Sequence, residues 1–434
     1  MKKLSVIVMG CGNRGSNYSR HMATMPEHYE IVGCADPDPA RRAKMHKLYN
    51  IPEDRCYNTY QEILSQPKMA DIALISVLDQ MHYEAALKAI DLGYDLLLEK
   101  PVAQTAEECA EIALAAQKKG VKVLVCHVLR YTPFFGRVKE LLMDGAIGEP
   151  VSVIHVEAVG NVHQSHSYVR GNWHSEAETT PMLLAKSCHD LDILQWLLDK
   201  PCKKVQSFGS LTHFTKENAP EGAPIRCADG GCPKADTCPY NCMKLYYDDK
   251  NNNWFRGTST KNIAKGEIAT DEEVLQALKT TDYGLCVYHA NNDVVDHQVV
   301  NMEFDGGITV SFTMNAFNKG GRYIRIFGTK GELMANMTDS TIQVYSFETK
   351  QWTDVPVTAT EESILGGHGG GDVGMVKEMI EFMQGEYTGY RCADIFTSVK
   401  NHLIGFAAER SRHNGTVEDM DKFMADYGFE NKYE

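Results

Sequence analysis

Apolar and amphipathic stretches alternate regularly over the first 126 residues. Runs typical of buried strands occur at 4–9, 30–35, 72–77, 95–98 and 121–126, and helical patterns occur at about 16–25, 38–49, 80–92 and 105–119. Thr105 and Glu108 form a capping-box pattern at the start of the last helix, and Gly120 ends it. The strand runs are almost continuously apolar. Together these features predict an α/β fold whose parallel sheet is covered by helices on both faces.

The pattern changes after about residue 128. Helical patterns are expected at about 132–144, 181–198, 372–385 and 393–412, and strands at 151–159, 204–212, 297–305, 307–315, 322–327 and 341–347. Asp305-Gly306-Gly307 is a hairpin signal. We therefore expect an α+β domain, 128–434, with a mostly antiparallel open sheet, after a first domain at 1–127. The stretch 214–290 is polar and irregular. We interpret it as a long excursion from this domain, called the excursion below.

The charge balance narrows the choice of partners. The 434-residue chain has 44 Lys and Arg against 58 Asp and Glu, a net charge of −14. Such a chain lacks the basic surface that nucleic acids require, and an anionic membrane surface is disfavoured for the same reason. With nucleic acids and anionic membranes disfavoured, a small-molecule partner is favoured by elimination. The exposed face expected of an open sheet also predicts a homodimer or homotetramer.

No apolar run approaches the ~20 residues of a membrane span. The N-terminal run follows Lys2 and Lys3 but ends after six residues at Gly10. A secretory signal needs about 7–15 apolar residues and a cleavage site. We therefore expect a cytoplasmic protein.

A glycine motif stands between the first strand and the first helix. Gly10, Gly12 and Gly15 form a G-x-G-x-x-G pattern that encloses Asn13 and Arg14. In this context the first glycine permits a tight turn, the second permits close approach of a pyrophosphate, and the third permits close helix–strand packing. The helix N-terminus supplies N–H groups and a positive dipole to the phosphates. The motif predicts a dinucleotide-binding Rossmann domain.

Asp36 ends the second strand, where a carboxylate accepts hydrogen bonds from the adenosine ribose. It would repel the 2′-phosphate of NADP, and Pro37 rather than Arg comes next. The sequence therefore favours NAD over NADP. Arg41 and Arg42 lie close enough in the chain to leave NADP open.

Further motifs follow in a fixed order: the Asp79-Gln80-Met81-His82 turn, Glu99-Lys100-Pro101, His189-Asp190-Leu191-Asp192, and the stretch from Arg325 to Leu333. With the glycine motif and Asp36, this order resembles the Gfo/Idh/MocA family, which includes glucose–fructose oxidoreductase and inositol dehydrogenase. The resemblance covers essentially the whole chain and is weakest in 214–290.

The resemblance implies roles for individual residues. Lys100 corresponds to the family's active-site lysine, and His189 to its usual proton relay. The turn after the third long strand, with Ser76, Leu78 and His82, would line the cofactor together with Glu99. Arg130 would lie near the nicotinamide.

One position departs from the family pattern. Many members carry Asp four residues before the histidine, where this chain has Ala185 followed by Lys186. On a continuous helix, Lys186 and His189 share a face. If Lys100 and Lys186 both face the substrate, their repulsion lowers the pKa of one and makes it a usable base. The alternative is that Lys186 points outward and His189 acts alone.

The segment 161–174 is polar and aromatic, as a carbohydrate site requires. His166, Arg170 and Trp173 are its candidate substrate contacts, and Asp190 could bind a sugar hydroxyl or orient His189. The alternative for the segment is an ordered surface loop. Asp372, after a run of glycines, is expected to cap the next helix.

The chain has 13 cysteines, most of them single and set in apolar runs. Cys227, Cys232, Cys238 and Cys242 instead cluster within the excursion, and Cys286 lies downstream. Such a cluster suggests a structural Zn²⁺ site with Cys227, Cys232 and Cys238 as three ligands. The fourth ligand is Cys286, as the resemblance to relatives with a similar loop implies, or Cys242. Free thiols or a disulfide remain open, and the spacing does not fit a ferredoxin cluster.

These features predict an NAD-dependent oxidoreductase that transfers hydride between nicotinamide and a secondary hydroxyl of a sugar, polyol or glycoside. One alternative is glycoside cleavage assisted by a tightly bound, recycled NAD. Another, of a different class, is a non-catalytic protein that senses NAD or a sugar.

Overall fold

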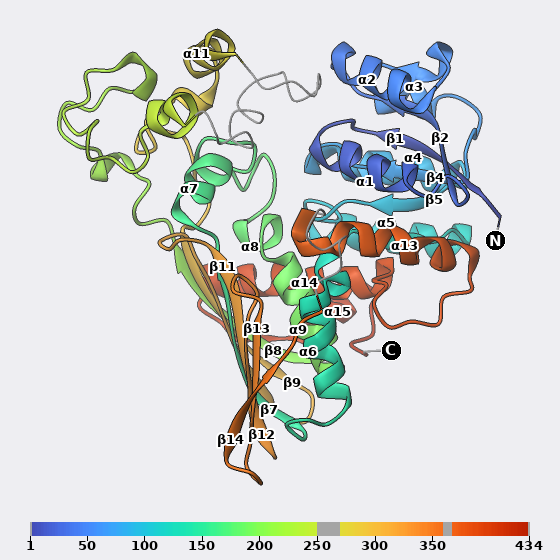
Figure 1. Cartoon of the computed structure of the whole chain (residues 1–434), viewed down its shortest axis with the longest axis vertical. Helices are drawn as coiled ribbons and strands as arrows, with labels where there is room; N and C mark the ends of the chain where they lie inside the picture. Colours follow the sequence, from blue (N-terminus) through green and yellow to red (C-terminus); the bar gives the residue numbers. More distant parts are fainter. Residues whose placement is uncertain (1, 250–269, 359–366, 433–434) are drawn as a thin grey trace.

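The computed structural model describes residues 2–249, 270–358 and 367–432. Two sheets lie in different parts of the molecule, the first near the N-terminus and the second at the opposite end, with helices between them (Figure 1). The part of the excursion at 250–269 lies outside the described residues.

The first sheet has six parallel strands in the order β3-β2-β1-β4-β5-β6. Its strands are β1 (Leu4–Met9), β2 (Tyr29–Ala35), β3 (Cys56–Tyr57), β4 (Ile72–Ile75), β5 (Asp95–Leu98) and β6 (Val123–Val125). The order reverses between β1 and β4, which is where a doubly wound sheet binds its ligand. The predicted fold class is therefore confirmed for this half.

Helices cover both faces of the first sheet: α1 (Asn13–Ala23), α2 (Pro39–Tyr49), α3 (Tyr60–Leu64), α4 (His82–Asp91) and α5 (Ala106–Lys119). The side chain of Thr105 accepts a hydrogen bond from the Glu108 N–H, as predicted, and Gly120 ends α5 with a left-handed conformation. The Glu108 carboxylate accepts from the Gln104 N–H, so the predicted capping box is only half formed.

A C-terminal helix completes this core. α13 (Gly371–Gln384) packs Met375, Val376 and Met379 against Val6 and Val8 of β1. The Tyr29 hydroxyl donates to the carbonyl of Val376. The chain therefore returns to the first sheet after building the second. The predicted division at residue 127 remains a prediction.

The second sheet has nine strands in the order β14-β13-β12-β11-β7-β10-β9-β8-β15. They are β7 (Pro150–Ala158), β8 (Cys202–Ser210), β9 (His297–Phe304), β10 (Ile308–Asn315), β11 (Gly321–Gly328), β12 (Gly331–Asn336), β13 (Thr341–Ser346), β14 (Gln351–Val355) and β15 (Glu418–Asp419). β7 and β10 pair in parallel, and the other neighbours are antiparallel. The mostly antiparallel sheet is as predicted.

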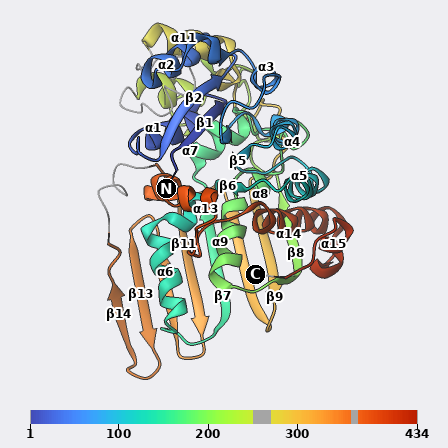
Figure 2. The same cartoon turned by 90° about the vertical axis from the view of Figure 1, so that its right-hand side faces the viewer.

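Helices lie on one face of this second sheet: α6 (Pro133–Met143), α9 (Cys188–Leu198), α14 (Ile395–Asn414) and α15 (Met420–Asp426) (Figure 2). The continuous helix expected at 181–198 is wrong. α8 (Met182–Ala185) ends at Lys186, and α9 begins at Cys188, with non-helical backbone at Ser187 between them. The break places Lys186 and His189 on different segments.

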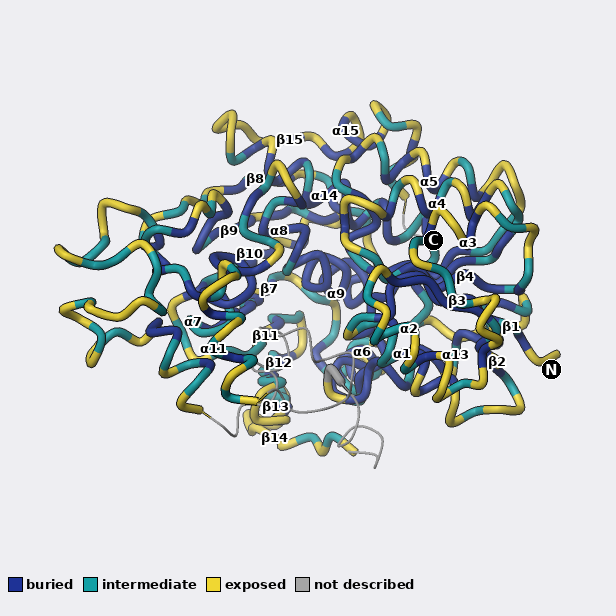
Figure 3. Tube along the Cα trace, turned by 90° about the horizontal axis from the view of Figure 1, so that it is seen from above, coloured by how far each residue is buried: buried dark blue, intermediate teal, exposed yellow. Residues whose placement is uncertain are grey.

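The excursion is built mainly of turns, with α11 (Asp271–Thr280) as its one described helix of ten residues. It lies beside α7 (Asn161–His163) and the following π-helical turn, Gln164–Val169. In Figure 3 the loops at this end are largely exposed, whereas the chain around α9 is buried. No described helix is both long and apolar enough to cross a membrane.

Candidate active site

The three motif glycines occupy different surroundings. A Cβ on Gly10, whose φ is +86°, would lie 2.4 Å from the Ser76 carbonyl oxygen, and a Cβ on Gly15 would lie 2.0 Å from that of Gly10. A Cβ on Gly12 would meet only the Arg41 guanidinium, at 3.5 Å. Gly10 and Gly15 are therefore required by backbone packing, while Gly12 leaves open space in front of α1. The first turn of α1, starting at Asn13, has no side-chain cap. These features fit a bound pyrophosphate.

Asp36 is nearly fully buried, and backbone groups position its carboxylate. Oδ2 accepts from the Cys11 N–H at 2.8 Å, and Oδ1 accepts from the Asp38 N–H at 2.8 Å. Each carboxylate oxygen has a second lone pair for a ribose hydroxyl. Arg41 Nη1 lies 3.6 Å from Oδ2, so Arg41 stands beside both Asp36 and Gly12. Arg42 instead donates to the Asp36 backbone carbonyl.

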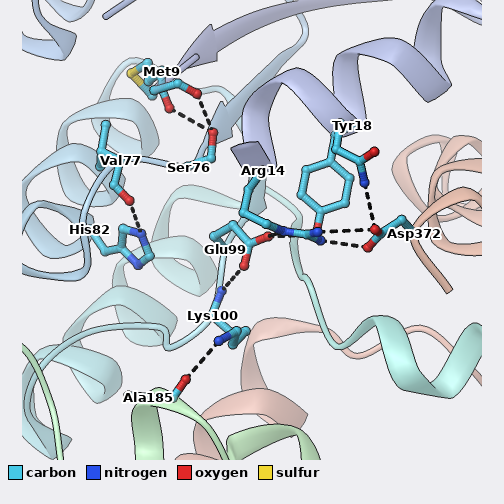
Figure 4. Close-up of polar contacts among 12 residues, drawn as sticks. Met9, Arg14, Tyr18, Ser76, Val77, His82, Glu99, Lys100, Ala185 and Asp372 are labelled. Carbon is cyan, nitrogen blue, oxygen red and sulfur yellow. Dashed lines mark hydrogen bonds and ion pairs between the residues drawn. The ribbon is translucent and has the colours of Figure 1, made fainter. Parts of the chain in front are cut away.

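Ser76 and His82 connect the ends of adjacent strands (Figure 4). The Ser76 hydroxyl donates to the carbonyl oxygen of Gly10 at 2.8 Å, and it lies 3.2 Å from the carbonyl oxygen of Met9, which Figure 4 labels. The buried His82 ring lies between the carbonyl oxygens of Pro101, at 2.8 Å, and Val77, at 3.2 Å. Leu78 remains 41% exposed at the edge of this turn. Of the three predicted residues, Leu78 is the exposed one, and Ser76 and His82 hold the surrounding loops together.

Arg14 and Glu99 belong to an internal ion network (Figure 4). Arg14 Nε donates to Glu99 Oε1 at 2.7 Å, and its Nη2 donates to Asp372 Oδ1 at 2.7 Å. The Tyr18 hydroxyl donates to the same Glu99 oxygen. Burial would raise the pKa of Glu99, but the charges of Arg14 and Lys100 outweigh burial and hold that pKa below its usual value. Both predicted cofactor residues thus position the glycine loop against β5 and α13.

Asp372 does not cap α13. Gly370 occupies the N-cap position, and no side chain caps this helix. The Asp372 carboxylate instead accepts from Arg14 and from Asn17 Nδ2, at 2.7 Å. The capping prediction is therefore wrong, because a pair of partners on α1 binds this carboxylate from across the chain.

Lys100 projects from the first domain to the second. Its Nζ donates to the carbonyl oxygen of Ala185 at 2.9 Å, at the end of α8 (Figure 4). Lys186 follows and pairs with Glu157 of β7, with 3.3 Å between Nζ and Oε1. The two lysines therefore meet at the junction of the domains.

Lys186 is mostly buried, with 17% of its side chain exposed, and this burial is the largest reason that its pKa is lowered. Glu157 acts in the opposite direction, while Arg322 and Lys100 add to the lowering. The lowered pKa agrees with the sequence interpretation, but its main cause is burial rather than repulsion from Lys100. A lysine in this environment has a larger neutral fraction near neutral pH than an exposed lysine.

Asp190 lies fully inside the molecule. Arg322 Nε donates to its Oδ1 at 2.9 Å, and His155 Nε2 lies 2.8 Å from the same oxygen. Burial opposes ionisation, but Arg322 and His155 outweigh it and lower the pKa of Asp190 to about 2. Arg322 Nε also lies 2.6 Å from Glu157 Oε2. Asp190 therefore anchors the charge network behind Lys186.

His189 is the second residue of α9 and is 6% exposed. Its ring packs edge-to-face on that of His127, with centroids 5.9 Å apart. Asp192, one turn further, accepts from Arg130 Nε at 2.8 Å and Nη2 at 2.6 Å, and from Asn401 at 2.6 Å. The Arg130 guanidinium is thus directed at Asp192, and joins the end of the first sheet to α9 and α14.

The three predicted substrate contacts on 161–174 have partners. Arg170 donates from Nε to the Leu285 carbonyl and from Nη2 to the Tyr240 carbonyl, both at 2.8 Å. His166 lies 3.1 Å from the Tyr246 hydroxyl and stacks on Tyr283. These two residues hold the excursion against the π-helical turn. Trp173 Nε1 donates to Asp79 Oδ2 at 2.8 Å and so links this segment to the first domain.

Sequence reasoning missed two residues beside the lysines. Burial, followed by the charges of Lys186 and other cationic neighbours that include Lys100, lowers the pKa of His163 to about 2. The ring of Tyr168 lies 5.7 Å from that of His163 and 6.1 Å from that of Trp173. His163 and Tyr168 lie in the segment 161–174, which its composition predicts to contact a carbohydrate. Only the geometry of the π-helical turn distinguishes them from His166 and Arg170.

The cysteines of the excursion gather around one pocket. Cys227, Cys232, Cys238 and Cys286 line it, together with Arg170. Cys242 does not line the pocket; it is fully buried with Tyr246 and Leu278, in a cluster against which Cys227 also packs. All thirteen cysteines are free thiols.

Comparisons with known proteins agree with this architecture. Residues 4–127 match the model of the Gfo/Idh/MocA oxidoreductase family, NAD-binding Rossmann fold. Residues 139–402 match the model of its C-terminal α/β domain. Fold and site thus define an NAD-binding oxidoreductase of two domains. The chain belongs to the Gfo/Idh/MocA family.

Individual relatives and solved structures have low sequence identity to this chain. YteT of Bacillus subtilis, an oxidoreductase by name, is 27% identical over 395 residues, which cover 86% of this chain and 88% of the relative. Inositol 2-dehydrogenase of Salmonella paratyphi B is 26% identical over 202 residues, which cover 46% of this chain and 56% of the relative. A solved levoglucosan dehydrogenase in complex with NADH and L-sorbose covers 97% of this chain and 99% of its own, with a TM-score of 0.69 at 17% identity. That structure shares the fold.

Proposed function

We propose that this protein transfers hydride between a bound nicotinamide and a secondary hydroxyl of a sugar or polyol. The observation that carries the proposal is the hydrogen bond of 2.9 Å from Lys100 Nζ to the Ala185 carbonyl. It brings a lysine of the cofactor domain to the start of the segment that holds Lys186 and His189. Sugar and polyol dehydrogenases among the similar proteins support this substrate class.

The residues around the glycine loop suit NAD. The open space at Gly12 and the uncapped start of α1 would accept the pyrophosphate, and Asp36 would accept the ribose hydroxyls. Leu78 lies at the edge of the same site. When bound, the nicotinamide supplies the hydride acceptor or donor. The buried carboxylate of Asp36 supports a preference for NAD over NADP.

The chain itself must orient the hydroxyl and remove its proton. We assign orientation to Lys100, whose ammonium is fixed by the Ala185 carbonyl. Lys186 would accept the proton, since burial lowers its pKa. His189 would relay the proton beside His127, and His163, Tyr168 and Trp173 would contact the remaining substrate hydroxyls.

The test starts with the purified protein. Denaturation followed by assay of the supernatant measures bound NAD(H) and NADP(H), and a screen of sugars and polyols with added NAD measures NADH formation. We expect NAD binding and turnover that falls by about 10²–10⁴-fold in Lys100→Met. Failure to bind either nucleotide would overturn the proposal.

The same experiment separates the alternatives. Stoichiometric NAD that is retained and not consumed, with cleavage of a glycoside, would indicate redox-assisted glycoside cleavage. Nucleotide binding without turnover of any sugar, polyol or glycoside would indicate a sensing protein. Exchangeable NAD with NADH formation supports the dehydrogenase.

We further propose that the exposed face of the second sheet joins two copies of the chain. Ile154 of β7, Phe208 of β8 and Tyr323 of β11 are 46%, 54% and 49% exposed there. Helices cover the opposite face (Figure 2). A second copy would bury these apolar side chains. The free thiols are consistent with the proposed cytoplasmic location.

A further inference from the structure

Backbone pairing brings distant cysteines of the excursion together. Arg226 and Leu285 form an antiparallel bridge, and the Cys286 N–H donates to the Ile225 carbonyl at 2.9 Å. Because this pairing is antiparallel, Cys286 lies opposite Ile225 rather than Cys227, but Cys227 and Cys286 both line one pocket. The turn that carries Cys232 and Cys238 completes the wall of the same pocket.

The surroundings of this pocket suit an anionic centre. Arg170 lines it and is 3% exposed. Its Nε and Nη2 donate to two carbonyls, while the buried Nη1 has no hydrogen-bond acceptor among the described residues. A buried guanidinium N–H that lacks an acceptor is costly, and a metal-bound thiolate would provide one.

We propose that Cys227, Cys232, Cys238 and Cys286 bind one Zn²⁺ ion. Four thiolates are the typical ligands of a closed, tetrahedral structural zinc site. Binding releases the thiol protons, and the resulting centre carries a charge of −2, which Arg170 partly balances. Cys242 is left out of the ligand set because it does not line this pocket, although Cys227 also packs against the cluster that Cys242 forms with Tyr246 and Leu278.

The ion would draw these turns closer together. Sulfurs of a tetrahedral site with Zn–S bonds of about 2.3 Å stand ~3.8 Å apart. Among the described residues, Glu176, Glu409 and His413 are the group whose possible ligand atoms already lie within 4.8 Å of one another. No three of the cysteine sulfurs in the described part of the chain lie that close together. The group of Glu176, Glu409 and His413 is not a competing site, since Arg412 already pairs with both of its carboxylates.

The position of the ion gives it a role in the proposed active site. Arg170 and His166 fasten the π-helical turn to the excursion, and the same turn carries Tyr168. The zinc ion would therefore stiffen the wall that contacts substrate, without touching the cofactor loop. This role rests on the proposed function, whereas zinc binding itself does not.

Metal content tests the binding directly. Elemental analysis of protein purified without chelators is expected to give one zinc per chain, and less than about a fifth of that in Cys238→Ser and Cys286→Ser. Cys242→Ser and the distant Cys392→Ser are matched controls that should keep it. Absence of zinc from the fresh wild-type protein, or iron with visible charge-transfer absorption in its place, would overturn the proposal. Loss of zinc in Cys242→Ser but not in Cys286→Ser would also overturn this ligand set.

Cobalt exchange keeps the test independent of how the variants fold. The wild-type chain loaded with Co²⁺ is expected to show intense thiolate-to-cobalt bands and the visible bands of tetrahedral coordination. Weak bands of octahedral cobalt would overturn the site.

The functional role has its own readout. In Cys238→Ser we expect NADH affinity within twofold of wild type, a raised KM for the sugar, and faster proteolysis within 214–290. A loss of NADH affinity as large as the rise in KM would contradict the role of the zinc ion in stiffening the substrate-contacting wall. Zinc without dehydrogenase activity would contradict the proposed function and leave the zinc site standing.

Discussion

The carboxylate of Asp36 is held by two backbone N–H groups, and Arg41 Nη1 lies 3.6 Å from it. In Asp36→Ser the ribose loses a charged acceptor, and Arg41 becomes available to a 2′-phosphate. We expect NADH binding to weaken by about 1.5–3 kcal/mol, roughly 10–150-fold, while NADPH binding improves. Fluorescence titration with both nucleotides measures the two effects.

The double variant Asp36→Ser/Arg41→Ala is the control for this change. It should keep the loss of NADH affinity and lack the gain for NADPH. An unchanged preference in Asp36→Ser would show that the carboxylate does not select the cofactor.

The pH dependence of the reaction tests Lys186. Burial lowers its pKa, Glu157 raises it, Asp190 also raises it, and Arg322 and Lys100 lower it. Oxidation requires the neutral amine, so the rate should rise with pH through this pKa. Glu157→Gln removes a group that favours the charged amine, so the pKa falls further and the limb of the pH–rate profile moves to lower pH.

Glu303→Gln provides the matched control, because Glu303 pairs with Lys204 on the exposed face of the same sheet. Its profile should coincide with that of the wild type. A limb that is unmoved, or that moves to higher pH, in Glu157→Gln would exclude Lys186 as the proton acceptor.

The residues that could be predicted from the sequence have local reasons for their identity. Gly10 has a positive φ, Gly15 is required by the carbonyl of Gly10 five residues earlier, and Lys100 lies two residues after β5. Glu157 and Arg322 could not be predicted. They reach Lys186 and Asp190 only because β7 and β11 pair, more than 160 residues apart in the case of Arg322 and Glu157.

At the scale of elements, strongly patterned segments were predicted well. β1 and β5 have the expected bounds, since each is an apolar run that ends at a glycine or a charged motif. β14 was missed because its residues are nearly all exposed and show no alternation. The helix at 181–198 was predicted as continuous because its apolar spacing does not reveal the break at Lys186 and Ser187.

The docking of α13 on α1 depends on one carboxylate. Asp372 is fully buried and accepts from Arg14 and Asn17. Asp372→Asn removes the charge while keeping the shape, so we expect a loss of about 1.5–3 kcal/mol in the free energy of unfolding. The position of α1 should also relax, with weaker NADH binding. Urea denaturation and nucleotide titration measure these effects.

Asp421→Asn serves as the comparison, because Asp421 pairs with Lys203 at the surface. Such a pair contributes about 0–1 kcal/mol. Equal stabilities of the two variants would contradict the role of Asp372.

At the scale of the whole molecule, the contacts between the halves include four near the proposed site. Lys100 reaches Ala185, Arg130 reaches Asp192, Trp173 reaches Asp79, and the Val102 N–H donates to His402 Nε2 of α14 at 3.1 Å. All of them start from the ends of β4, β5 and β6 or from the segment that faces those ends. The proposed site is therefore made by residues of both halves, and neither half alone holds its lysines and histidine together.

The last prediction concerns the association of two copies of the chain through the exposed face of the second sheet. Ile154 and Tyr323 lie on neighbouring antiparallel strands and project from the face opposite the helices. Two copies that pack through this face would bury both side chains. Ile154→Glu/Tyr323→Glu would place charges inside that interface, so light scattering should show a dimer or tetramer for the wild type and the mass of one chain for the double variant. Leu48→Glu on α2, where the leucine is 57% exposed and far from the sheet, should keep the wild-type mass. A wild-type chain that is monomeric at all concentrations, or a double variant that associates normally, would show that this face does not join two copies.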